Sequence, residues 1–234
     1  MKKILITGGT SGIGYSILRK FHEKDCMIYF TYSKNKYLAK KIEKKYKNTK
    51  SINLNLNSKS SINKLSKNIK DKLDCIILNA AQTLFVEKKN FRKFTPELFE
   101  KYVNVNLTSQ YRIFFNLLDK INTNSNVIFI SSIASKNGIG SNVAYSAAKA
   151  GLNNLSISLS KIFGKKFQIN CIAPGLMRTK FTSKFGKNYF KKNEIRTSTN
   201  KLSTPENISE VAYSVFSNFK NFTGQTIYVD GGSS

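Results

Sequence analysis

A glycine-rich loop near the amino terminus joins a short apolar run to a segment with helical periodicity. The apolar run Lys3–Thr7 predicts a buried strand, Gly8–Gly14 predicts the loop, and Tyr15–Phe21 predicts a helix. A further apolar run, Cys26–Thr31, predicts a second strand. A strand, a helix and a strand within about 30 residues predict a right-handed βαβ unit, and hence a parallel sheet. No other stretch constrains the fold as strongly.

The same alternation continues to the end of the chain. Further strands are predicted at residues 50–54, 73–78, 126–130, 167–172 and 226–229, and helices at 37–46, 58–70, 95–120, 145–163 and 204–219. Residues 82–94 and 180–203 lack periodicity and are predicted to be loops. We expect an α/β protein with a Rossmann-type three-layer fold around a doubly wound parallel sheet of about seven strands. No linker or repeat divides residues 1–234, so we expect one domain.

The glycine loop has the context that dinucleotide binding requires. Glycines let the backbone approach a pyrophosphate closely, and the helix that follows presents its positive amino-terminal end to that anion. The alternative is a plain turn between a strand and a helix. The candidate cofactor-binding residues in this loop are Gly8, Thr10, Ser11, Gly12, Ile13 and Gly14.

The end of the second strand bears on the choice of cofactor. An acidic residue there would bind the adenosine ribose of NAD and repel a 2′-phosphate. The chain has no acid at this point, but it has Ser33, Lys34 and Lys36. We therefore expect NADP (NADPH), with NAD less favoured. The alternative is that these are ordinary surface lysines in a lysine-rich protein.

Tyr145 and Lys149 lie four residues apart and share one face of a predicted helix. The phenol has a pKa of about 10 in isolation, and a nearby ammonium favours its ionised form. Such a pair can act as an acid near neutral pH. The alternative is an ordinary solvated helix face, and spacing alone does not decide between them.

The chain is strongly basic, with 39 Lys and Arg against 13 Asp and Glu, a formal net charge of +26. The lysines accompany many asparagines and isoleucines, as an AT-rich genome would produce, and they are spread along the chain. We find no motif typical of nucleic-acid binding and do not expect it as the main function. A preference for acidic substrates or partners stays open.

The sequence shows no pattern typical of membrane insertion, secretion or metal binding. No apolar run approaches the about 20 residues of a membrane span, and the first one is too short for a signal peptide, so we expect no membrane association and a cytoplasmic protein. Cys26, Cys75 and Cys171 lack metal-ligand spacing and are expected to be buried thiols. With His22 as the one histidine, we expect no metal site.

Together these segments resemble the short-chain dehydrogenase/reductase family over essentially the whole chain. The residues that carry the resemblance are Thr7-Gly-x-x-x-Gly-Ile-Gly14, Asn79-Ala80, Asn106, Ser132, Tyr145-x-x-x-Lys149, Asn170-x-Ile-x-Pro-Gly175, Thr179 and the terminal Gly-Gln-x-x-x-Val-Asp-Gly-Gly run. One glycine loop is weak evidence, whereas the ordered set at these separations is specific.

The resemblance implies a role for each matched residue. Tyr145 would exchange a proton with the carbonyl or alcohol, Lys149 would lower the pKa of Tyr145 and bind the nicotinamide ribose, and Ser132 would hold the substrate oxygen. Asn106 would position a water that links Lys149 to solvent. The other implied cofactor contacts are Asn55, Leu56, Asn79, Ala80, Ala81, Pro174, Gly175 and Thr179. Asn55 and Ala81 depart from the family's usual aspartate and glycine.

The resemblance implies a carbonyl reductase or alcohol dehydrogenase that uses NAD(P)H. The favoured reaction is the reduction of 3-oxoacyl groups carried on acyl carrier protein, a step of fatty acid biosynthesis. Acyl carrier protein is acidic, and the lysines expected to bind it are Lys120, Lys161, Lys165 and Lys166. Another small ketone, sugar or polyol remains an alternative, as does a non-catalytic cofactor sensor or basic scaffold. An enoyl reductase is disfavoured, because that branch spaces its tyrosine and lysine farther apart. The family also implies a homo-oligomer, a tetramer or a dimer.

Overall fold

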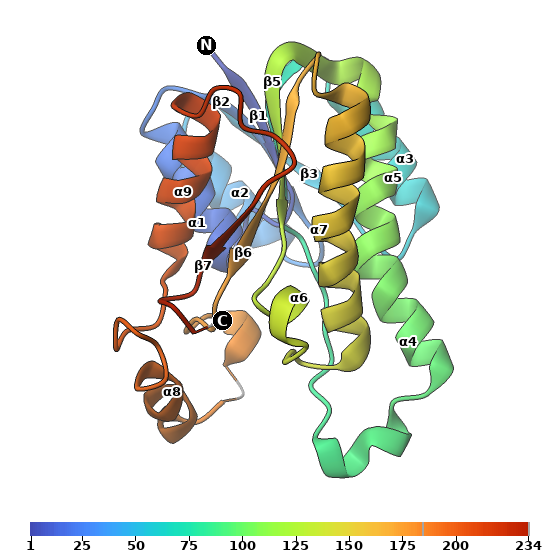
Figure 1. Ribbon diagram of the computed structural model, residues 1–234. Helices are drawn as coiled ribbons and strands as arrows, with labels where there is room; N and C mark the ends of the chain where they lie inside the picture. The colour runs from blue at the N-terminus through green and yellow to red at the C-terminus, as the bar shows by residue number, and fades with distance from the viewer. Residues whose placement is uncertain (184, 234) are drawn as a thin grey trace.

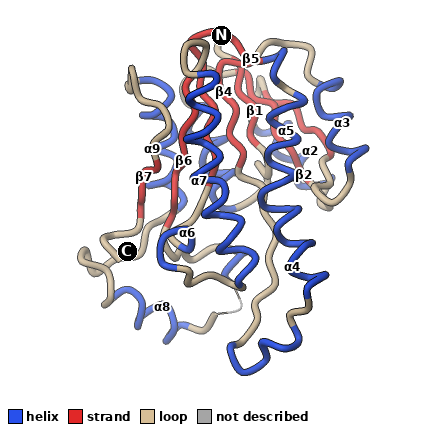
Figure 2. Tube along the Cα trace, turned by 45° about the vertical axis from the view of Figure 1, so that its right-hand side comes forward, coloured by secondary structure: helices blue, strands red, loops and turns tan. Residues whose placement is uncertain are grey.

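A twisted parallel sheet forms the centre of the protein, in a computed structural model that describes residues 1–183 and 185–233. In this part of the chain seven strands lie in the order β3-β2-β1-β4-β5-β6-β7, and every neighbouring pair is parallel. Helices cover both faces of the sheet (Figures 1 and 2). The predicted three-layer, doubly wound fold is therefore confirmed.

The strands and helices follow the order that the sequence predicts. The strands are β1 (Lys3–Ile6), β2 (Met27–Tyr32), β3 (Thr49–Asn53), β4 (Leu73–Leu78), β5 (Ile121–Ile130), β6 (Gln168–Pro174) and β7 (Thr226–Val229). The helices are α1 (Gly12–His22), α2 (Lys36–Lys45), α3 (Lys59–Asn68), α4 (Pro96–Val103), α5 (Ser109–Asn116), α6 (Ala134–Asn137), α7 (Val143–Phe163), α8 (Lys187–Glu194) and α9 (Pro205–Ser217).

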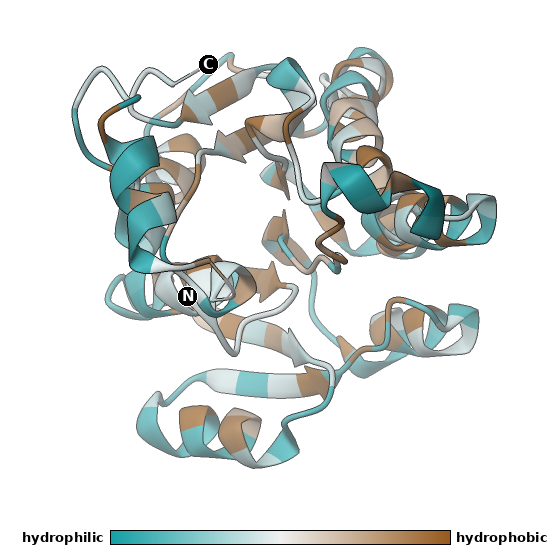
Figure 3. Ribbon diagram, turned by 90° about the horizontal axis from the view of Figure 1, so that it is seen from below, coloured by the Kyte–Doolittle hydropathy of each residue, from teal (hydrophilic) through white to brown (hydrophobic). Residues whose placement is uncertain are grey.

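Alternate residues of each central strand pack against opposite layers, because side chains alternate in direction along a strand. Leu5 of β1 packs with residues of α3, α5 and α7, whereas Ile4 and Ile6 pack with residues of α1, α2 and α9. These apolar clusters bury both faces of the sheet, which explains the nearly continuous apolar runs of the inner strands. In Figure 3 the apolar residues concentrate on the strands and on the helix faces turned toward them.

Several predicted segments differ from the structure. The predicted loop 82–94 contains a 3-10 helix, Lys88–Lys93, and the strand predicted at 126–130 begins at Ile121. The long helix predicted at 95–120 is divided, because a π-helical turn, Asn104–Thr108, separates α4 from α5 and a short 3-10 turn, Leu118–Lys120, follows. A π turn adds a residue to one turn of helix, and apolar periodicity does not reveal it. The predicted loop 180–203 contains α8, whose high lysine content conceals its single buried anchor, Phe190.

The expectation that the three cysteines are buried thiols is confirmed, and side chains cap two of the helices. The Ser58 side chain caps α3, and the Thr204 side chain caps α9. Cys26, Cys75 and Cys171 are free, buried thiols. Among the described helices, none combines the length and the apolar character that crossing a membrane requires.

Thr7 connects the two strands between which the direction of winding reverses. Its buried hydroxyl oxygen accepts hydrogen bonds from the backbone N–H groups of Asn79 and Ala80, both at 2.9 Å, just beyond β4. The Asn79 amide donates back to the Thr7 carbonyl at 2.9 Å. In a doubly wound sheet, ligands bind at the carboxyl ends of the strands beside this reversal. Thr7 therefore fixes the floor of the crevice.

We predict that Thr7→Val destabilises the protein by about 2 kcal/mol. Valine keeps the shape of threonine but leaves two part-buried N–H groups without an acceptor. Each such loss should cost about 1 kcal/mol, the lower end of the range of about 1–3 kcal/mol for fully buried groups. Thr7→Ser is the matched control, because it retains the hydroxyl and loses only a methyl group. Urea denaturation measures both free energies of unfolding. Equal losses in the two variants would contradict the role given to the hydroxyl.

Candidate active site

A cavity of ≈720 Å³ lies at the carboxyl ends of the strands. Its walls come from the glycine loop, the ends of β2, β4, β5 and β6, the first turns of α7, and the segment from Pro174 to Thr197. These parts of the chain are far apart in sequence, and the parallel sheet brings their ends to one edge (Figure 1). Among the described residues that line the cavity, Asp230 is the one carboxylate.

The glycine loop forms one wall of this cavity. Gly8 has φ +72° and Gly12 has φ +53°, values that side-chain-bearing residues rarely adopt. Gly14 does not line the cavity, because it packs beneath the loop, where a Cβ would overlap the Gly8 carbonyl. The backbone therefore remains close to the cavity at the amino-terminal end of α1, where N–H groups and the helix dipole favour an anion.

Tyr145 lies in the first turn of α7. The Asn142 side chain caps this helix by accepting a hydrogen bond from the Tyr145 N–H at 2.8 Å. The phenol reaches Ser132, which follows β5, and both line the cavity. Burial raises the pKa of the Tyr145 phenol to about 12, and the hydrogen bond with Ser132 partly opposes that rise. The phenol is therefore protonated throughout the neutral range.

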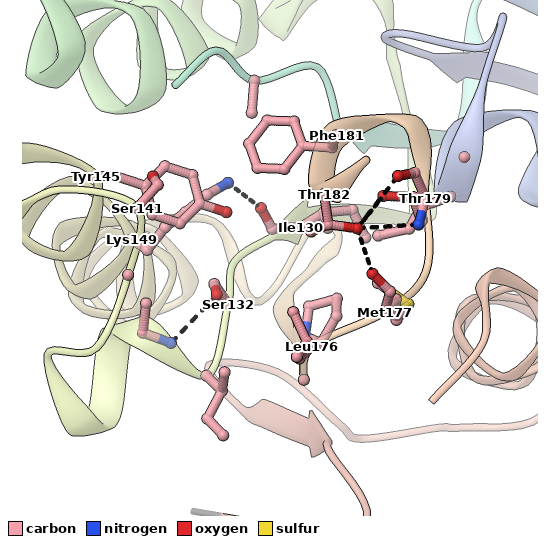
Figure 4. Close-up of a pocket in the computed structure, with 18 of the residues that line it drawn as sticks. Ile130, Ser132, Ser141, Tyr145, Lys149, Leu176, Met177, Thr179, Phe181 and Thr182 are labelled. Atoms are coloured by element: carbon pink, nitrogen blue, oxygen red, sulfur yellow. Dashed lines mark hydrogen bonds between the residues drawn. The ribbon is translucent and has the colours of Figure 1, made fainter. Parts of the chain in front are cut away.

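Lys149 is buried one helical turn beyond Tyr145. Its ammonium donates a hydrogen bond to the Ile130 carbonyl at 2.6 Å and lies 5.5 Å from the centre of the Tyr145 ring (Figure 4). Burial lowers the pKa of the Lys149 ammonium to about 8. Burial is the main cause of both shifts, and the lowering of the Tyr145 pKa by Lys149 stays a prediction.

Asn106 lies in the π turn and is fully buried. Its Nδ2 donates to the carbonyls of Gln82 and Tyr102, both at 2.8 Å, and its Oδ1 accepts from the Gln82 N–H at 3.1 Å. Both amide protons are thus engaged, and the side chain anchors the cavity wall at Gln82. Asn106 is not among the described residues that line the cavity, and its water relay stays a prediction.

Most of the predicted cofactor contacts line the cavity. Those that do are Gly8, Thr10, Ser11, Gly12, Ile13, Ser33, Leu56, Asn79, Ala80, Ala81, Tyr145, Lys149, Pro174, Gly175 and Thr179. Lys34 and Asn55 are not among the lining residues of the described chain. Lys34 follows Ser33 on the exposed rim, and the Asn55 side chain turns back to accept a hydrogen bond from the Asn57 N–H at 3.0 Å.

Sequence reasoning missed two groups of lining residues. Lys180, Lys192 and Arg196 add positive charge to the wall formed by the segment 176–197. Phe85, Phe181 and Phe185 add an apolar wall beside Tyr145. The available signal for the second group was the presence of aromatic residues in the predicted loops 82–94 and 180–203. Hydrophobic periodicity does not predict where the side chains of a loop point, so it could not place these residues.

The four lysines predicted to bind acyl carrier protein lie at the wrong end of the molecule. They are Lys120, Lys161, Lys165 and Lys166. Tyr145 begins α7 at the cavity, whereas Lys161 lies sixteen residues further along the helix, about 24 Å away at the usual rise. Lys120 precedes β5 and Ser132 follows it, so the two residues lie at opposite ends of this strand. This docking prediction is therefore wrong.

Comparison with known proteins agrees with this arrangement. A family model described as "Enoyl-(Acyl carrier protein) reductase" matches residues 8–234. A 3-oxoacyl-[acyl-carrier-protein] reductase of Aquifex aeolicus is 29% identical over 99% of this chain and 96% of its own length. A tropinone reductase homolog of Arabidopsis thaliana is 31% identical over 99% of this chain and 90% of its own.

Solved structures share the fold. The Pseudomonas aeruginosa RhlG/NADP active-site complex superposes with a TM-score of 0.90 at 23% identity, over 99% of this chain and 96% of that one. BdcA in complex with NADPH superposes with a TM-score of 0.88 at 20% identity, over 99% and 93% of the two chains. The chain belongs to the short-chain dehydrogenase/reductase family. Within that family it is an oxidoreductase, similar along its whole length to the 3-oxoacyl-[acyl-carrier-protein] reductases.

The buried ammonium of Lys149 predicts a specific dependence of stability on pH. Its pKa is about 8 in the folded protein and 10.5 in the unfolded reference. Between these values the unfolded chain binds the additional proton, so stability rises with pH through this window and falls as pH decreases toward 8. The change amounts to about 3 kcal/mol.

Lys149→Met removes the titrating group and isolates this effect. The difference in unfolding free energy between the native protein and the variant should shift by about 3 kcal/mol in favour of the native protein between pH 7.5 and 10.5. Chemical denaturation at both pH values measures it. Tyr145 is present in both proteins, so its own titration largely cancels. A difference that does not change with pH would show that Lys149 keeps its ordinary pKa.

Proposed function

We propose that this protein reduces carbonyl groups with NADPH and that Tyr145 supplies the proton. One observation carries the proposal: the Tyr145 phenol contacts Ser132 and lies beside the Lys149 ammonium, in the same cavity as the glycine loop. Reduction of a carbonyl by hydride needs both a proton donor and groups that stabilise negative charge on the oxygen. These residues provide them.

The cavity fits a dinucleotide that carries an additional phosphate. The space beside Gly12 is open, since among the described residues a Cβ there would touch only Thr179, at 3.9 Å. No acidic residue lies directly at the end of β2, and Ser33 lines the cavity where the adenosine ribose would bind. We therefore assign NADPH, and the complexes of RhlG with NADP and BdcA with NADPH support this assignment.

Four side chains carry out the other parts of the reduction. When bound, NADPH supplies the hydride. Tyr145 then gives its phenolic proton to the carbonyl oxygen, while the Ser132 hydroxyl donates a hydrogen bond to the same oxygen. The Lys149 ammonium stabilises the phenolate that forms at Tyr145, which offsets the cost that burial places on that charge. Asn106 holds the wall at Gln82 and so keeps the space around the carbonyl fixed.

We assign 3-oxoacyl groups carried on acyl carrier protein as the substrate class, and with it a role in fatty acid biosynthesis. The 3-oxoacyl-[acyl-carrier-protein] reductases that match the whole chain support this assignment. Lys180, Lys192 and Arg196 at the cavity place positive charge where an acidic carrier would deliver its acyl group. We further propose one domain over residues 1–234, a cytoplasmic location and a homotetramer.

Tyr145→Phe tests the proton donor. Phenylalanine keeps the ring but removes the hydroxyl, so we expect kcat for reduction of a 3-oxoacyl thioester to fall at least about 100-fold. The NADPH dissociation constant, measured by fluorescence titration, should change by less than about threefold. Tyr111→Phe is the control, because Tyr111 is an exposed tyrosine on α5. Turnover that survives in Tyr145→Phe would refute the proposed acid.

A second prediction concerns the additional phosphate of NADPH. Lys34 lies on the rim next to Ser33, so Lys34→Ala should weaken NADPH binding about three- to tenfold and leave NADH binding unchanged. Lys70→Ala, which removes an exposed lysine after α3, is the matched control. Isothermal titration calorimetry measures all the dissociation constants. If Lys34→Ala weakens both cofactors equally, the lysine does not recognise the phosphate.

A further inference from the structure

We propose that three aromatic side chains select carbonyl substrates that carry an apolar arm, and disfavour sugars and polyols. The residues are Phe85, Phe181 and Phe185, and we name them the aromatic clamp. This inference rests on the proposed function and narrows its substrate. Two chain segments build the clamp, one from the loop after β4 and one from the segment after β6.

The clamp joins these segments beside the proton donor. The ring centres of Phe85 and Phe185 are 4.8 Å apart, and those of Phe85 and Phe181 are 6.2 Å apart. The Phe181 ring lies 6.1 Å from the Tyr145 ring, and all four residues line the cavity. Figure 4 shows Phe181 projecting into the same space as Tyr145 and Lys149. A group attached to a carbonyl at Tyr145 must therefore meet phenyl rings.

Hydrogen bonds outside the clamp fix the backbone beside Phe85. The Val86 N–H donates to the Ser141 carbonyl at 3.1 Å, and the Asn142 amide donates to the Leu84 carbonyl at 2.8 Å. Both bonds tie the Phe85 loop to the segment that begins α7. The position of Phe85 relative to Tyr145 is therefore set by the fold before any substrate enters.

The segment that carries Phe181 is fixed in the same way. The Thr182 hydroxyl donates to the Met177 carbonyl at 2.5 Å and accepts from the Thr179 N–H at 3.0 Å. Thr182 is buried, so the turn at Lys180–Thr182 presents Phe181 to the cavity while its neighbour anchors the chain. Both sides of the clamp are thus built before an apolar group arrives.

Exposed apolar surface gathers at the mouth of the cavity. Phe181 is 41% exposed, Tyr189 is 43% exposed and Ile139 is 75% exposed, and all three line the cavity. An apolar substrate arm would cover this surface and remove it from water. A polyhydroxylated substrate would instead lose the hydration of its hydroxyls against phenyl rings, which offer no hydrogen-bonding groups in exchange. The aromatic clamp therefore favours an alkyl or aryl arm.

Three ketones that differ beside the carbonyl test the proposal. They are ethyl 3-oxo-3-phenylpropanoate, ethyl 3-oxobutanoate and dihydroxyacetone, each assayed for kcat/KM with NADPH. The native protein should prefer the phenyl ester and use dihydroxyacetone least. In Phe181→Ala the ratio of kcat/KM for the phenyl ester to that for the butanoate ester should fall about tenfold, which corresponds to about 1.4 kcal/mol. Phe91→Ala, which removes a 59% exposed phenylalanine near the same loop, should keep the native ratio.

Other outcomes overturn the clamp or separate it from the reductase claim. An unchanged ratio in Phe181→Ala, or a native preference for dihydroxyacetone, refutes the clamp while the reductase function stands. If the native protein reduces none of the three ketones, the proposed function fails. The clamp is then tested separately, by calorimetric titration of the NADPH-loaded protein with the phenyl ester. Binding that weakens about tenfold in Phe181→Ala supports the clamp. Equal binding, or none, refutes it.

Discussion

Two hydrogen bonds join the beginning of α7 to the end of β5, and the site depends on them. The Lys149 ammonium donates to the Ile130 carbonyl at 2.6 Å, and the Ser131 hydroxyl donates to the Lys149 carbonyl at 3.0 Å. They hold the helix that carries Tyr145 against the strand that ends at Ser132. Because both bonds are buried, breaking either would leave polar groups without partners. The contact between the phenol and Ser132 follows from this junction.

Burial raises the free energy of the charged forms of Tyr145 and Lys149, and the proton transfer exploits this. Burial makes ionisation of Tyr145 and protonation of Lys149 unfavourable, so a nearby charge of opposite sign would stabilise the charged form of each group. Transfer of the phenolic proton creates a negative charge beside the ammonium. The protein is thus more complementary to the state after proton transfer than to the resting state, which is what acceleration of the chemical step requires.

The extent to which the sequence predicts this protein differs between its fold and its site. Strands such as Leu73–Leu78 and the glycine loop have local signals, so the fold was predictable, whereas Ser132, Tyr145 and Lys149 were assigned through the resemblance of the ordered motifs to a known family. Asn106 was placed on the correct helix, but its partners depend on a π turn and on a loop 24 residues away in the chain. Clusters formed by distant segments have no local signal: the docking lysines were assigned to the wrong end, and the aromatic clamp was missed. Loop side chains are directed by tertiary hydrogen bonds such as that of Asn142 with Leu84.

The family description names enoyl reduction, whereas the spacing of Tyr145 and Lys149 favours reduction of a carbonyl. Transfer of deuterium decides between these reactions most directly. The protein is incubated with NADPH deuterated at the transferred position and an equal mixture of a 3-oxoacyl and a 2-enoyl thioester, and the products are analysed by mass spectrometry and NMR. We predict a 3-hydroxyacyl thioester with deuterium on the carbinol carbon and an unchanged enoyl thioester. A saturated, deuterated acyl thioester with the 3-oxoacyl compound left intact would contradict this account.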